Sequence, residues 1–87
     1  MTDIKVADND TQHRFEITVE DKVAGFARYR TEPGAVVFTH TEIDPAFEGQ
    51  GLGSKLAAAA LQEVRDRGLE IVPECPFIAA YLKRHPG

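Results

Sequence analysis

The stretch Phe47–Gly53 contains three glycines and has the clearest potential for chemistry in this sequence. Gly49, Gly51 and Gly53 alternate with other residues where an amphipathic segment begins. A glycine-rich loop that leads into a helix gathers backbone N–H groups at one point, and the helix dipole favours negative charge there. Glycine also lets the backbone approach a phosphate without a Cβ atom in the way. The spacing favours an anion site over a plain tight turn. It matches neither the dinucleotide fingerprint nor a P-loop, which needs Gly-Lys-Ser/Thr.

Two residues that could move a proton precede this loop. His40 and Glu42 are two positions apart on a predicted strand, so we expect them to share a face with Val36 and Phe38. Histidine is the side chain best suited to accept a proton near neutral pH, and a buried glutamate can do the same. A histidine satisfied by a neighbour and a solvated carboxylate are the ordinary alternatives, and the residues alone leave both open.

A possible nucleophile and two cations lie near the C-terminus. Cys75 precedes Pro76, where a helix is predicted to begin, so it occupies the N-cap or an adjacent position. The dipole of a helix favours the reactive thiolate at that end, although a free cysteine is more often a small buried apolar residue. Lys83 and Arg84 fall in the last turn of the same helix, where they could reach a phosphate or simply be solvated.

The elements that must position these residues follow the order β-β-β, glycine loop, α, β, α. Periodicity and turn residues predict four strands and two helices; they are strands at 14–19, 23–30, 35–43 and 69–73, and helices that begin at Leu52 and Pro76. The first three strands should form an antiparallel meander, and the strand–helix–strand unit should add a parallel strand. We therefore expect a small α+β (α/β) fold in one domain, residues 1–87, with an extra N-terminal strand left open.

Composition and charge exclude several other classes of protein. The 87 residues carry a net charge of −4, which is not the basic footprint of a nucleic-acid binder. No apolar run approaches the roughly 20 residues that a membrane span needs, and Met1–Asp10 lacks the pattern of a signal peptide. One cysteine and three scattered histidines predict no metal site and a reducing, cytoplasmic setting. An open sheet edge fits a monomer or a weak homodimer.

The glycine loop and its flanks resemble a known family. Ile43-Asp-Pro-Ala-Phe-Glu-Gly-Gln-Gly-Leu-Gly53 is similar to the acetyl-CoA loop of the GNAT superfamily of N-acetyltransferases, with Glu48 where Arg or Gln is usual. The segments 38–43 and 75–86 resemble the minimal YjdJ-type branch of that superfamily. The resemblance covers nearly the whole chain and implies a trimmed version of the GNAT fold.

The resemblance also implies how acetyl-CoA would bind. The pantetheine arm would enter a splay between the third and fourth predicted strands, where the main chain near Glu42 and Ile43 would pair with its amide. The pyrophosphate would be held by the backbone N–H groups of six consecutive residues, namely Gly49, Gln50, Gly51, Leu52, Gly53 and Ser54. Lys83 and Arg84 are the side chains expected to reach a phosphate.

By resemblance, the activity is acetyl-CoA-dependent N-acetylation of a primary amine, either a small amine or a protein lysine or N-terminus. The superfamily commonly carries its base on the strand of His40 and Glu42. Tyr81 approximately matches the tyrosine that protonates the departing thiolate, and a core aromatic paired with Phe77 is the alternative. Direct transfer is favoured over an acetyl-Cys75 intermediate. The acceptor site should be open and shallow.

A non-catalytic module that binds acyl-CoA or another phosphate ligand is the second functional hypothesis. Such a module would keep the fold and the glycine loop without turnover. Convergence of His40 or Glu42 with Cys75 at the thioester end of the splay would favour an enzyme, and their dispersal would favour the binding module.

Overall fold

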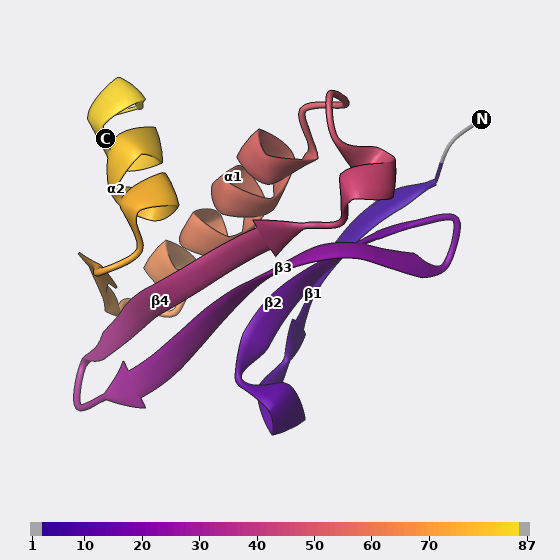
Figure 1. Ribbon diagram of the computed structural model, residues 1–87. Coiled ribbons are helices and arrows are strands. Elements are labelled where there is room, and N and C mark those ends of the chain that lie inside the picture. Colours follow the sequence, from indigo (N-terminus) through magenta and orange to yellow (C-terminus); the bar gives the residue numbers. More distant parts are fainter. Residues whose placement is uncertain (1–2, 86–87) are drawn as a thin grey trace.

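The chain forms one five-stranded sheet in which the strands lie side by side in sequence order, as the computed structural model of residues 3–85 shows (Figure 1). The strands are β1 (Ile4–Asn9), β2 (Arg14–Val19), β3 (Lys22–Glu32), β4 (Ala35–Ile43) and β5 (Glu70–Pro73). The helices are α1 (Leu52–Asp66) and α2 (Pro76–Arg84), with short 3-10 turns η1 (Asp10–Gln12) and η2 (Pro45–Phe47). Strands β1 to β4 pair antiparallel and β5 pairs parallel to β4. The predicted meander and strand–helix–strand unit are confirmed, and β1 is the extra N-terminal strand.

Two tight turns set the register of the meander. Glu20 and Asp21 link β2 to β3 with positive φ angles of 49° and 68°, as the turns that suit hairpin twist require. Pro33 and Gly34 link β3 to β4, and Gly34 has a φ of 76°, which glycine adopts without strain. These turns fix which residues of β2, β3 and β4 lie opposite one another.

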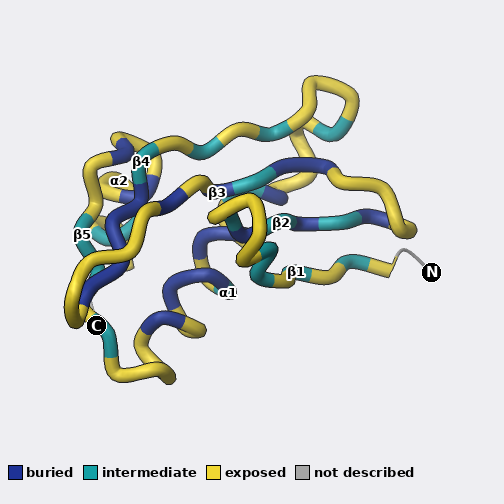
Figure 2. The backbone as a smooth tube through the Cα atoms, turned by 90° about the horizontal axis from the view of Figure 1, so that it is seen from below, coloured by how far each residue is buried: buried dark blue, intermediate teal, exposed yellow. Residues whose placement is uncertain are grey.

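One face of the sheet packs against both helices, as Figures 1 and 2 show. The buried face of α1 is the one that helical spacing predicts, and it consists of Leu52, Leu56, Ala57, Ala60, Leu61 and Val64. These residues share one core with Phe15, Ile17 and Phe38 of the sheet and with Ile78 of α2. Within residues 3–85, neither helix is long and apolar enough to cross a membrane.

A β-bulge in β4 places His40 and Glu42 on the opposite face of the sheet from the one predicted. Tyr29 pairs with Phe38 whereas Arg28 pairs with His40, so Thr39 is an extra residue in β4. An extra residue reverses the alternation of side chains beyond it. Phe38 is in the core, but His40 and Glu42 are exposed on the opposite face. The expectation that they share a face with Val36 and Phe38 is therefore wrong, because it assumed an unbroken strand.

A polar network fastens β1 to the rest of the sheet. The Tyr29 hydroxyl donates a hydrogen bond to Asp8 at 2.5 Å, and Arg67 beyond the end of α1 pairs with Asp8 at 2.9 Å. Burial, together with this hydrogen bond to a carboxylate, raises the pKa of Tyr29 well above its usual range. Tyr29 thus remains a neutral donor, and β1 and the end of α1 are held at one point.

Gly25 of β3 lies where β3 closely approaches the end of β4, and a substitution there tests this contact. A Cβ atom at this position would lie 2.6 Å from the Glu42 carbonyl oxygen and would also overlap the Ile43 side chain. Gly25→Ala should therefore lower the free energy of unfolding by about 1–3 kcal/mol, the usual cost of an overpacked core. Urea unfolding measures this, and an unchanged midpoint would contradict the close approach.

Candidate active site

The edge of β4 is open beyond the end of β5. The resemblance implied a splay between these two strands, whereas β5 pairs with β4 over its whole length. The two strands pair only from Ala35 opposite Glu70 to Phe38 opposite Pro73. The backbone N–H of Cys75 then donates to the Phe38 carbonyl at 2.8 Å, after which the chain turns into α2. The rest of β4, up to Ile43, extends beyond the end of β5. This second half of β4 can therefore offer main-chain groups to a bound molecule.

The glycine loop follows directly from the end of β4. The Asp44 carboxylate accepts a hydrogen bond from the Ala46 N–H at 2.9 Å and so caps the short turn η2. Gly49 and Gly51 then have φ angles of 83° and 71°, and a Cβ atom at either would meet nothing within 4 Å. In the described part of the chain, no side chain caps the N-terminus of α1. The loop is thus an open cradle that Cβ atoms would fill, and the first N–H groups of α1 are available to an anion.

Gly53 differs from the two glycines before it. A Cβ atom on Gly53 would lie 2.8 Å from Cζ of Phe77 on α2. This glycine is therefore needed for the packing of α2 against the first turn of α1. Its backbone N–H is still part of the predicted phosphate site.

A groove connects this loop with the C-terminal half of α2. A cavity of about 330 Å³ is lined by the end of β4, the loop and α2, through Ile43, Phe47, Glu48, Gly49, Gly51, Leu52, Gly53, Ser54 and Phe77. A hollow of about 110 Å³ shares Ser54 and Phe77 with it and extends to Tyr81 and Arg84. Of the two predicted cations, Arg84 therefore joins the groove, whereas Lys83 lies exposed and lines neither space. Gln50 is also exposed.

Cys75 lies at the closed end of the opening, on the helix side of the sheet. It is the N-cap residue of α2, as predicted, and is only 3% exposed. Its Sγ donates a hydrogen bond to Oγ1 of Thr41 at 3.3 Å. Thr41 points inward because of the bulge at Thr39. Sequence reasoning missed Thr41, since it assigned that position to the solvent side of the strand.

His40 and Glu42 form a pair on the other face of the sheet. Nε2 of His40 lies 3.7 Å from Oε2 of Glu42, and the two side chains are 59% and 62% exposed. Phe26 lies beside them, with its ring centroid 6.1 Å from that of His40. The His40–Glu42 pair is therefore separated from Cys75 by the backbone of β4.

Tyr81 lies beside the glycine-loop end of the groove, away from Cys75. It stacks on His85 with ring centroids 4.4 Å apart, and it lines the same hollow as Ser54 and Arg84. It is six positions from Cys75, which corresponds to about 9 Å along a helix. Its ring also packs partly against the core, so the position favours a wall of the groove over a proton donor to the thiolate.

Comparison with known proteins agrees with this geometry. The family described as GCN5-related N-acetyl-transferase matches residues 14–87, which include every strand except β1, together with the glycine loop and α2. The chain is also similar to Protein NATD1 of Xenopus tropicalis, Gallus gallus and Homo sapiens, at 38% identity over 47 residues in each case.

Those 47 residues make up 54% of this chain and 42–43% of the relatives, so the similarity to NATD1 spans less than half of each relative's length. The family match is far more extensive, and the residues that it covers contain the whole groove and all four candidate catalytic residues. The chain belongs to the GCN5-related N-acetyltransferase family.

Proposed function

We propose that this protein transfers the acetyl group of acetyl-CoA to a primary amine. The observation that supports this most directly is the groove, which runs from Ile43 at the end of β4 along the open glycine cradle to α2. A long ligand with an anionic end fits that arrangement. Members of this family generally use acetyl-CoA, and the open cradle agrees with a pyrophosphate.

Different groups of the chain would bind different parts of acetyl-CoA. The backbone N–H groups from Gly49 to Ser54 bind the pyrophosphate, with the dipole of α1 behind them. The main chain of Glu42 and Ile43 pairs with the pantetheine amide. Arg84 lies at the far end of the same groove, where its guanidinium can reach a phosphate from the edge, and Lys83 is exposed beside it.

Bound acetyl-CoA supplies the acetyl group as a thioester. Transfer forms a bond between the acceptor nitrogen and the acetyl carbon and breaks the carbon–sulfur bond. The proton that the nitrogen loses goes to His40, whose imidazole is held by Glu42, and solvent protonates the departing thiolate. The N-terminus of α2 at Cys75 favours the negative charge on that sulfur. Direct transfer needs no covalent step on Cys75.

One observation favours the alternative, a non-catalytic module that binds acyl-CoA. The backbone of β4 lies between His40 and Cys75, so His40, Glu42 and Cys75 do not meet at one point. Direct transfer needs only the His40–Glu42 pair to meet the acceptor, and that pair is open to solvent. Measured turnover separates the two functions.

Acetyl-CoA should stabilise the protein and be consumed when an amine is present. A ligand at about 100 times its dissociation constant adds about 2.7 kcal/mol to the free energy of unfolding, which should raise Tm by several degrees. A thermal melt and a thiol-release assay with a panel of amines measure both effects. Stabilisation without thiol release would assign the binding module, and no stabilisation at millimolar acetyl-CoA would contradict both functions.

Gly51→Val should abolish binding of acetyl-CoA, because a branched side chain would occupy the cradle. Gly68→Val is a matched control, since Gly68 has a φ of 74° and equally open surroundings but lies at the other end of α1. Both variants should lose about 1–2 kcal/mol of stability through a left-handed non-glycine residue. Calorimetry should show loss of binding in Gly51→Val alone, and equal affinities would show that the loop is not the phosphate site.

His40→Ala should lower the rate of transfer about a hundredfold or more, the usual contribution of a positioned base. Cys75→Ala should retain most of the activity if transfer is direct. Mass spectrometry after incubation with acetyl-CoA and no acceptor should then show no acetylated protein. An acetyl adduct that maps to Cys75 and disappears when an amine is added would overturn direct transfer.

A further inference from the structure

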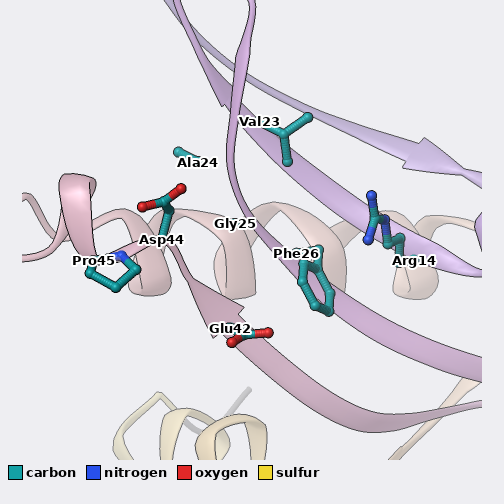
Figure 3. Close-up of a pocket in the computed structure, with 8 residues that line it drawn as sticks. All are labelled: Arg14, Val23, Ala24, Gly25, Phe26, Glu42, Asp44 and Pro45. Atoms are coloured by element: carbon teal, nitrogen blue, oxygen red, sulfur yellow. The ribbon is translucent and has the colours of Figure 1, made fainter.

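A second cavity lies on the open face of the sheet, away from the groove. It has a volume of about 290 Å³ and lies between the start of β3 and the end of β4 (Figure 3). It shares no lining residue with the groove but includes Glu42, the partner of His40. A molecule in this cavity would therefore lie beside the proposed base.

Two carboxylates, those of Glu42 and Asp44, and one cation, Arg14, line this cavity. Asp44 uses Oδ1 to cap η2, and Glu42 contacts only the imidazole of His40 among the described residues. Arg14 also lines the cavity, but its Nε donates to Glu16 at 2.7 Å and its guanidinium stacks on Phe26, 4.7 Å from the ring centroid. In Figure 3 the ring of Phe26 stands between Arg14 and Glu42, and Asp44 lies farther from Arg14, beyond Gly25. Arg28 also lies over the ring of Phe26, 5.6 Å from its centroid, but does not line the cavity. With Arg14 neutralised by Glu16, the two carboxylates outnumber this one remaining guanidinium, and the cavity favours a cation.

The remainder of the wall is apolar. Val23 is 47% exposed at the rim, which is unusual for a large aliphatic side chain in this protein. The ring of Phe26 is half-buried across from it, and Ala24 and Gly25 contribute surface without long side chains. Such a wall suits an aliphatic chain, because contact with it removes apolar surface from water.

We propose that this cavity binds the acceptor of the transfer as an alkylammonium ion, a primary amine on an apolar stem with no carboxylate beside the nitrogen. This proposal rests on the proposed function. The ammonium lies between Glu42 and Asp44, and the stem lies against Val23 and Phe26. The ammonium releases one proton to solvent, and the neutral nitrogen gives its second proton to His40 as it bonds to the acetyl carbon and CoA departs. A carboxylate next to the nitrogen would face Glu42 and Asp44, since Arg14 is already bound to Glu16.

NMR titration of ¹⁵N-labelled protein tests the site without any need for turnover. The probes are n-pentylamine and norleucine, which is the same amine with a carboxylate beside the nitrogen. n-Pentylamine should shift the amide signals of residues 23–26 and 42–44 and should bind at least about tenfold more tightly than norleucine, the effect of like charges brought together at a partly desolvated site. Equal affinities, or shifts confined to other parts of the sheet, would overturn the proposal.

Two variants and a control locate the effect in the cavity. Asp44→Asn removes one charge but keeps a residue that caps η2, and Val23→Lys adds a like charge at an exposed position. Each should weaken binding of n-pentylamine about three- to fivefold, the effect of one exposed charge pair. Glu70→Gln makes the same charge change at an exposed position of β5 and should have no effect. A loss in Glu70→Gln equal to that in Asp44→Asn would show non-specific attraction and overturn the site.

The thiol-release assay separates this proposal from the proposed function. If n-pentylamine binds at the cavity through Asp44 but no amine releases thiol, the transfer is wrong and the cation site stands. If amines are acetylated and KM is unchanged in Asp44→Asn and Val23→Lys, the function stands and the acceptor site is wrong.

A further probe, Nα-acetyl-lysine methylamide, carries the same alkylammonium on a peptide unit. Tighter binding than n-pentylamine supports a protein lysine as the source of the amine, and equal binding supports an alkylamine of any source. Failure of both probes to bind would overturn the proposal.

Discussion

The extra residue Thr39 in β4 determines which side chains face the helices and which face solvent. Before it, Val36 and Phe38 point into the core, and after it Thr41 takes the inward position while His40 and Glu42 turn outward. The bulge lies immediately after Phe38, where the pairing with β5 ends. The first half of β4, residues 35–38, is therefore buried and anchors the strand in the core. In the second half, residues 39–43, one face of the strand points toward the helices and the other toward solvent. The proposed cofactor lies toward the helix face of this second half, and the proposed acceptor lies on the open face.

The sequence predicted the elements well because their signals are local. The apolar spacing from Leu52 identified the buried face of α1, and Pro76 after Cys75 marked the first residue of α2. The glycine spacing likewise identified the loop, which depends on φ angles that other residues rarely adopt. Each of these signals is contained in a few consecutive residues.

The face of the sheet on which each site residue lies could not be predicted in the same way. Thr39 is an ordinary β-forming residue within a run of β-forming residues, so nothing local marks it as the bulge. Its conformation depends on the pairing of β3 with β4 from Phe38 to His40, which is a tertiary property. The cavity beside Glu42 was missed for the same reason, because Arg14, Val23 and Asp44 come from three distant places in the chain. The cap that Asp44 provides, however, has a local signal, since Asp-Pro commonly begins such a turn.

The glycines fall into two kinds. Close packing requires glycine where no space is left for a Cβ atom, whereas the proposed ligand site has glycines with open space beside them. Gly25 and Gly53 lack side chains because β4 and Phe77 already occupy the space where a Cβ atom would lie. Gly49 and Gly51 have open space there, so packing does not explain them, and their left-handed φ angles and the uncapped N-terminus of α1 remain as the reasons for glycine.

The same distinction between local and overall properties applies to charge. The net charge of −4 does not conflict with the proposed anion site, because the Debye length is about 10 Å at 0.1 M salt and distant carboxylates are largely screened. What an anion meets in the groove is the N-terminal dipole of α1 and Arg84, opposed by Glu48 at the wall. The carboxylates that remain effective on the other face are those of Glu42 and Asp44. Opposite faces of one strand can therefore attract an anionic cofactor and a cationic acceptor, and this arrangement suits a reaction that joins the two.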